Sequence, residues 1–151
     1  MIIVSACLAG AACRHDGRAK EDTRIKNLAA KGLAMPLCPE VMGGRTVPRT
    51  PCEIKNGTGA DVLEKKASVV DRDGNDVTAE VVEGAMQVVA AAKRLIVTAA
   101  ILKTKSPACG RGLIYDGTFT GKLVEGNGVL AEALIREGIK VYTEEDCGET
   151  V

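Results

Sequence analysis

Aromatic side chains are scarce in this sequence. Its 151 residues include no tryptophan, one phenylalanine and two tyrosines, so aromatics make up only 2% of the chain. Hydrophobic residues still reach 46%, and we therefore expect an aliphatic core built from Val, Ile, Leu and Ala. The length suits one compact domain, and we assign residues 1–151 to a single α/β domain.

The sequence also lacks an excess of charge of either sign. Lys and Arg total 20, Asp and Glu total 20, and the formal net charge is zero. Proteins that bind nucleic acid mainly through its phosphates usually carry a basic excess. We therefore expect a small-molecule substrate and no extensive nucleic-acid surface, although a local basic patch stays open. The oligomeric state is not indicated.

Long hydrophobic runs are missing as well. The apolar stretch at residues 1–4 is too short for a signal peptide, and no run approaches the ~20 residues of a membrane span. We therefore predict a cytoplasmic protein without a membrane segment. Cytoplasmic thiols are kept reduced, so the six cysteines favour metal binding or catalysis over disulfides.

Apolar runs and helical spacing alternate along the chain. Strands are predicted for four short apolar runs, at 1–5, 33–37, 95–102 and 139–142. Helices are predicted at 21–31, 78–94 and 129–137. Long loops are expected at 39–60 and 110–128, and a small hairpin or meander at 61–78. This order predicts a single-domain α/β fold with a mostly parallel, doubly wound (Rossmann-like) sheet and long functional loops.

Three cysteines follow predicted strands. Cys7 follows the first strand, Cys38 the second, and Cys109 the turn after the strand at 95–102. Ligands of open α/β sheets bind at the carboxyl ends of the strands, so these thiols are predicted to share one edge.

A structural zinc site usually has four ligands in C-x-x-C pairs, and the sequence has no C-x-x-C. Three cysteines can hold a [4Fe–4S] cluster with one iron open as a Lewis acid. Spacing alone leaves a cluster, zinc and plain buried thiols open.

The other cysteines leave the ligand set open. Cys13 comes shortly after Cys7 and could replace it as a ligand or support it. We prefer Cys7 because it stands closer to the end of its strand. Cys52 and Cys147 fit the simpler interpretation of small buried hydrophobic residues.

Four polar residues lie near the same predicted edge, and each has a simpler alternative role. Glu40 could orient water or act as a general base, or be a solvated loop residue. Ser106 could donate a hydrogen bond to a substrate carbonyl, or only stabilise a turn. Arg49 and Lys103 could neutralise an anionic substrate or cluster, or be solvated.

Several motifs occur together in a fixed order. They are Ser5-Ala-Cys-Leu-Ala-Gly10, Cys13-Arg-His-Asp-Gly17, Cys38-Pro-Glu40 with Gly43-Gly44, Pro48-Arg-Thr-Pro51, Ala100-Ile-Leu-Lys103, Ser106-Pro-Ala-Cys-Gly110 and Ile114-Tyr-Asp-Gly117. In this combination the chain resembles the bacterial thiouracil desulfidase family, over roughly residues 4–145. One departure is Cys52, which stands where the family usually has a small residue such as alanine.

The resemblance implies an oxygen-sensitive [4Fe–4S] cluster held by Cys7, Cys38 and Cys109, which aerobically prepared protein could lack. The open iron would take sulfur from a thiolated pyrimidine, giving uracil and sulfide without net redox change. Glu40 and Ser106 would be the acid/base and substrate-positioning residues, and a free base or nucleoside is the expected substrate. The alternative is a zinc- or cluster-binding module that binds a nucleotide or senses redox state without catalysis.

Overall fold

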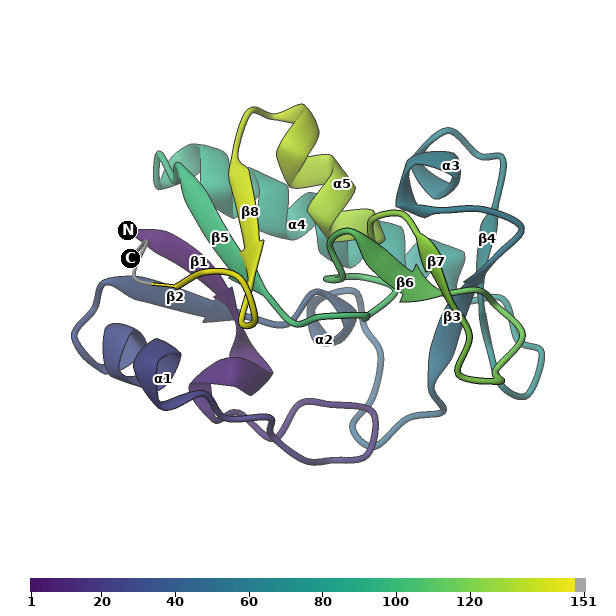
Figure 1. The fold of residues 1–151 in the computed structure, drawn as a ribbon, viewed down its shortest axis with the longest axis horizontal. Helices are drawn as coiled ribbons and strands as arrows, with labels where there is room; N and C mark the ends of the chain where they lie inside the picture. The colour runs from purple at the N-terminus through teal and green to yellow at the C-terminus, as the bar shows by residue number, and fades with distance from the viewer. Residues whose placement is uncertain (149–151) are drawn as a thin grey trace.

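The computed structural model describes residues 1–148, so the last three residues of the predicted domain lie outside the described part. At its centre is a four-stranded parallel sheet in the order β2–β1–β5–β8 (Figure 1). Its strands are Ile2–Ser5 (β1), Ala34–Leu37 (β2), Ala99–Leu102 (β5) and Lys140–Thr143 (β8). The helices are Ala6–Ala9 (η1, a 3₁₀ helix), Thr23–Ala30 (α1), Pro39–Met42 (α2), Gly59–Leu63 (α3), Thr78–Arg94 (α4) and Val129–Arg136 (α5). The predicted α/β fold with a parallel sheet is confirmed.

Alternate residues of the sheet strands enter two separate cores. Ile3 and Leu102 belong to a large core that includes the buried faces of α4 and α5. Their neighbours Val4 and Ile101 belong to a smaller core with α1 and η1. Helices thus cover both faces of the sheet, which is why its strands are apolar on both sides and the fold is doubly wound.

The predicted small hairpin at 61–78 is present, because Val70 and Asp76 pair in antiparallel fashion across the turn between them. Two short antiparallel pairs of strands lie in the ranges predicted as loops or next to them. They are formed by Cys52–Lys55 (β3) with Ser68–Asp71 (β4), and by Leu113–Tyr115 (β6) with Leu123–Glu125 (β7). The prediction of long loops at 39–60 and 110–128 is therefore wrong, because the first range contains α2 and β3 and the second contains β6 and β7. The range 61–78 supplies β4, whose partner β3 lies outside that range.

The strand predicted at 95–102 begins later than expected. Helix α4 matches its prediction, and Leu95 caps its carboxyl end. Ile96 then takes a left-handed conformation with φ of 54° and is 83% exposed, so the chain turns before β5 begins at Ala99. A continuous apolar run does not show where a helix cap ends and a strand starts.

Helix α2 packs against α4 through backbone contact. A Cβ atom on Gly84 would lie 1.7 Å from the carbonyl oxygen of Pro39, and one on Gly43 would lie 1.8 Å from that of Glu80. Only glycine permits so close an approach. The contact fixes the start of α2, which carries Glu40 directly after Pro39.

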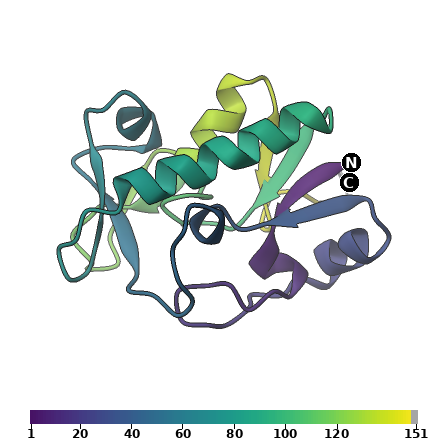
Figure 2. The same ribbon diagram turned by 180° about the vertical axis from the view of Figure 1, so that it is seen from behind.

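Helix α4 connects the two halves of the molecule. Figure 2 shows it running from the β3–β4 pair at one end to the parallel sheet at the other.

No helix within residues 1–148 has the length and apolar character needed to cross a membrane.

Candidate functional site

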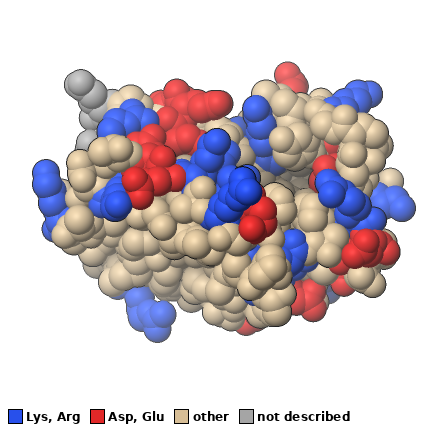
Figure 3. All heavy atoms as spheres, turned by 90° about the horizontal axis from the view of Figure 1, so that it is seen from below, with Lys and Arg blue, Asp and Glu red and all other residues tan. Residues whose placement is uncertain are grey.

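A cavity of about 780 Å³ lies at the carboxyl ends of the parallel strands. Its wall includes Cys7 after β1, Cys38 after β2, Lys103 after β5 and Glu144 after β8. Strands β1 and β5 are neighbours in the sheet although β2 comes between them in the chain, so the cavity lies at a topological switch point. Acidic and basic side chains are mixed on the surface seen from below (Figure 3).

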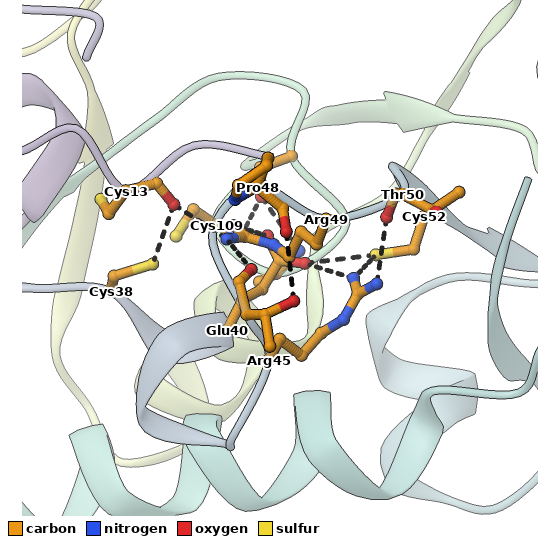
Figure 4. Close-up of polar contacts among 12 residues, drawn as sticks. Cys13, Cys38, Glu40, Arg45, Pro48, Arg49, Thr50, Cys52 and Cys109 are labelled. Carbon is orange, nitrogen blue, oxygen red and sulfur yellow. Dashed lines mark hydrogen bonds and ion pairs between the residues drawn. The ribbon is translucent and has the colours of Figure 1, made fainter. Parts of the chain in front are cut away.

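Five of the six cysteines line this cavity, and all six are free thiols. The predicted ligands Cys7, Cys38 and Cys109 are among them, and so are Cys13 and Cys52. The Cys38 thiol lies 4.0 Å from the carbonyl oxygen of Cys13 (Figure 4). The structure therefore places Cys13 beside the predicted ligands and keeps it as a candidate. The sixth cysteine, Cys147, packs in the smaller core.

The Cys38 and Cys109 thiols are protonated in the absence of a metal. The pKa of the Cys38 thiol is raised far above its ordinary value, mainly by its hydrogen bond with Cys13 and secondly by burial. Burial raises the pKa of Cys109 to about 12. A metal that binds here would displace these protons, as metals do when they bind thiolates.

Glu40 lies between two guanidinium groups at the cavity wall (Figure 4). Arg45 Nη1 is 2.9 Å from its Oε1, and Arg49 Nη2 is 3.1 Å from its Oε2. Burial alone would raise the pKa of the Glu40 carboxyl, but the ion pairs with Arg49 and Arg45 outweigh it and hold the pKa below its usual value. The solvated alternative does not describe this residue, because Glu40 is a carboxylate in a nearly closed environment.

Cys52 contacts the same pair. Its thiol lies 3.3 Å from Glu40 Oε1 and accepts a hydrogen bond of 3.1 Å from Arg45 Nη1. Burial and the charge of Glu40 raise the pKa of Cys52 well above the ordinary thiol value. Cys52, which departs from the motifs quoted above, is therefore a neutral thiol that contacts Glu40 and helps to hold it in position.

The Arg49 side chain is deeply buried, and its Nε–H donates no hydrogen bond to another residue within 1–148. Its side chain is 4% exposed, and its Nη1 donates to the carbonyl oxygens of Cys13 and Thr46 at 2.9 and 3.2 Å. Its Nε has no hydrogen-bond partner among residues 1–148. This Nε–H is itself buried, while other parts of the Arg49 side chain line the cavity.

Ser106 and Lys103 also line the cavity, and both already have partners. Ser106 Oγ accepts from the backbone N–H groups of Ala108 and Cys109, at 3.1 and 3.0 Å, so it fixes the turn that carries Cys109. Its own O–H can still act as a donor. Lys103 Nζ forms an ion pair of 3.1 Å with Glu144, so its charge is compensated within the protein.

Sequence reasoning missed several residues in or beside the cavity. Arg45 pairs with Glu40, but it follows two glycines in a segment interpreted as loop and carries no recognisable signal. Tyr115 and Phe119, two of the three aromatics in the chain, both line the cavity. The only signal in the sequence was the rarity of aromatic residues. The structure places two of the three in the wall of one cavity.

The donor set fits a thiolate-ligated cluster. Within residues 1–148, no group of three or more His, Cys, Asp or Glu side chains is arranged to hold a single metal ion. Cys7, Cys38 and Cys109 share one cavity, and thiolates are the usual protein ligands of iron–sulfur clusters. The positive charge of Arg49 favours the thiolate form of Cys38.

Comparison with known proteins places this architecture in a family. The sequence matches the family model for 2-thiouracil desulfurase over residues 2–146. It is 44% identical over 149 residues to YbbK of Bacillus subtilis (strain 168), an uncharacterized protein, with 99% of each chain covered. The solved structure of the [4Fe–4S]-dependent thiouracil desulfidase TudS is similar with a TM-score of 0.86 and 39% identity, covering 98% of this chain and 93% of that one. The chain therefore belongs to the 2-thiouracil desulfurase family, as its motifs had indicated.

Proposed function

We propose that this protein removes sulfur from a thiolated pyrimidine, using a [4Fe–4S] cluster held by Cys7, Cys38 and Cys109. One structural observation carries the proposal: thiols from the carboxyl ends of three parallel strands line one cavity together with the Glu40 carboxylate. Family membership and the similarity to TudS support the choice of substrate class and cofactor.

The cluster would supply one kind of chemistry. Held by Cys7, Cys38 and Cys109, it would have one iron without a protein ligand, which would supply a Lewis acid for the substrate sulfur. The protein side chains supply the remaining functions, which are proton transfer, orientation and charge compensation.

Glu40 is the proton acceptor of the proposed reaction. Its ion pairs with Arg45 and Arg49 keep it charged, so it can take a proton from a water molecule as that water attacks the ring carbon bearing sulfur. The carbon–sulfur bond breaks, a carbon–oxygen bond takes its place, and the water protons leave with the sulfur. One thiouracil and one water give one uracil and one hydrogen sulfide, and no electron is gained or lost.

The substrate is oriented by donors in the cavity wall. The Ser106 O–H is free to bond to a polar atom of the pyrimidine ring, and the Arg49 guanidinium is a second polar group in the same wall. Lys103 contributes through its ion pair with Glu144, which makes that side of the cavity polar without leaving a net charge. These donors suit a neutral ring such as thiouracil or its nucleoside.

The experiment is anaerobic reconstitution with iron and sulfide, followed by incubation with 2-thiouracil and 4-thiouracil. We expect uracil and sulfide in equal amounts without an added reductant, and no turnover by iron-free protein. Iron-loaded protein that releases no sulfide from either compound would overturn the proposal. Stoichiometric zinc without iron in anaerobically purified protein would instead favour the binding or sensing module.

A further inference from the structure

Phe119, the only phenylalanine of the chain, belongs to neither hydrophobic core. It sits in the loop between β6 and β7 and lines the cavity, where it is half-buried. In Figures 1 and 2 the β6–β7 pair lies on the opposite side of the strand ends from α1. A large apolar ring that is left out of the core and turned to a cavity is available to a ligand.

The loop holds this ring in place at a conformational cost. Phe119 has a φ of 58°, a left-handed conformation that non-glycine residues rarely adopt. The Glu53 carboxylate, buried on β3, accepts the backbone N–H groups of Gly117 and Phe119 at 3.0 and 3.1 Å. A Cβ atom on Gly117 would lie 2.6 Å from the carbonyl oxygen of Ile54, so the loop backbone rests directly on β3. Strain that is held by such contacts is typical of functional positions.

Arg72 lies over one face of the Phe119 ring. Its guanidinium carbon lies 5.8 Å from the centroid of the Phe119 ring, within cation–π range, and Arg72 also lines the cavity. Arg72 occupies one face of the ring, so a planar ligand in the cavity would use the other face.

We propose that Phe119 is a substrate-binding residue on which the pyrimidine ring stacks, with Arg72 on the other face of the Phe119 ring. The inference rests on the proposed function, since it assigns a binding partner to the base at the same cavity. Stacking requires only the flat face of the base, so it complements the polar donors Ser106 and Arg49, which contact its edges. It acts on substrate, product and transition state alike, and therefore belongs to binding rather than to the chemical step.

The test compares Phe119→Leu with Phe119→Tyr in iron-loaded protein. Leucine keeps the apolar bulk and the same backbone strain but loses the flat ring, whereas tyrosine keeps the ring. We expect Phe119→Leu to raise KM for thiouracil roughly 5- to 100-fold with kcat nearly unchanged, as loss of base–aromatic stacking implies. Phe119→Tyr should stay within about twofold of wild type.

A second readout does not depend on turnover. Because Phe119 is the only phenylalanine, its ring gives a single set of NMR signals, which should shift when uracil, the product, is added. Uracil should also bind Phe119→Leu more weakly by the same factor as the change in KM. Wild-type turnover with an unchanged KM in Phe119→Leu and no ring shift would overturn the stacking role and leave the proposed function intact. No turnover by wild type would overturn the proposed function itself.

Discussion

Two guanidinium groups define what Glu40 can do. A carboxylate paired with Arg45 and Arg49 on separate oxygens is held in its charged form, so the role proposed for it is that of a base and not of an acid. The Cys52 thiol, a neutral neighbour of Oε1, adds a contact without competing for that charge. The position of Glu40 directly after Pro39 brings this charge to the wall of the cysteine-lined cavity.

Glu40→Gln tests this role with little change of shape. The amide cannot accept a proton from water, so we expect kcat to fall about 10²- to 10⁴-fold, the usual contribution of a general base. Iron content should stay at the wild-type level, because Glu40 is not a proposed ligand. The matched control is Glu83→Gln on the exposed face of α4, which should keep full activity. Unchanged turnover in Glu40→Gln would rule out the base.

Position relative to the strands explains which site residues could be predicted. Cys7, Cys38 and Glu40 follow directly on strand ends, and parallel strands bring their ends to one edge, so local sequence was sufficient. Arg45 contacts Glu40 within a short segment that has no regular periodicity. Phe119 reaches the cavity from a loop whose path depends on a contact far along the chain, with Glu53. No local pattern encodes that path.

Among the elements, the glycine contact between α2 and α4 controls the site most directly. Gly84→Ala should gain helix propensity, worth about 1 kcal/mol, but its methyl group would collide with the carbonyl oxygen of Pro39. We expect a net loss of roughly 1–3 kcal/mol in the free energy of unfolding, as for overpacked cores, together with reduced turnover because Glu40 is displaced. Denaturant unfolding measures the first effect.

The control for this variant lies on the same helix. Gln87→Ala on the exposed face of α4 should change the free energy of unfolding by less than about 0.5 kcal/mol. Gly84→Ala with wild-type stability and turnover would mean that the contact does not position the site.

Elements with strong local signals were predicted well, and those that depend on distant partners were not. Helix α4 has apolar residues at helical spacing over its whole length, and its bounds match the prediction. Strand β3 pairs with β4 across an intervening helix, α3, and its sequence Cys-Glu-Ile-Lys is too short and too polar to indicate a strand by itself. Its stability comes from the pairing and from Ile54, which is buried in the large core.

At the scale of the whole molecule, the proposed cluster would join segments that are otherwise held by two separate cores. Cys7 packs in the smaller core and Cys109 in the larger one, and both line the cavity. A group that binds only the folded chain stabilises it by about 3–4 kcal/mol when present at 100 to 1,000 times its dissociation constant. The iron-loaded protein should therefore have a Tm roughly 5–15 °C above the iron-free form.

Cys147→Ala provides the matched control for this measurement. Cys147 lies in the smaller core outside the residues that line the cavity, so its removal should lower both Tm values and keep their difference. Equal Tm values for iron-loaded and iron-free wild type would show that the cluster does not bridge the two cores.

Iron content across a series of cysteine variants tests the central claim most directly. After anaerobic reconstitution, wild type, Cys13→Ala and Cys147→Ala should each hold about four irons per chain. Cys7→Ala, Cys38→Ala and Cys109→Ala should each lose most of that iron and all turnover of thiouracil. A wild-type iron content in Cys109→Ala, or loss of iron in Cys13→Ala but not in Cys7→Ala, would contradict the ligand set proposed here.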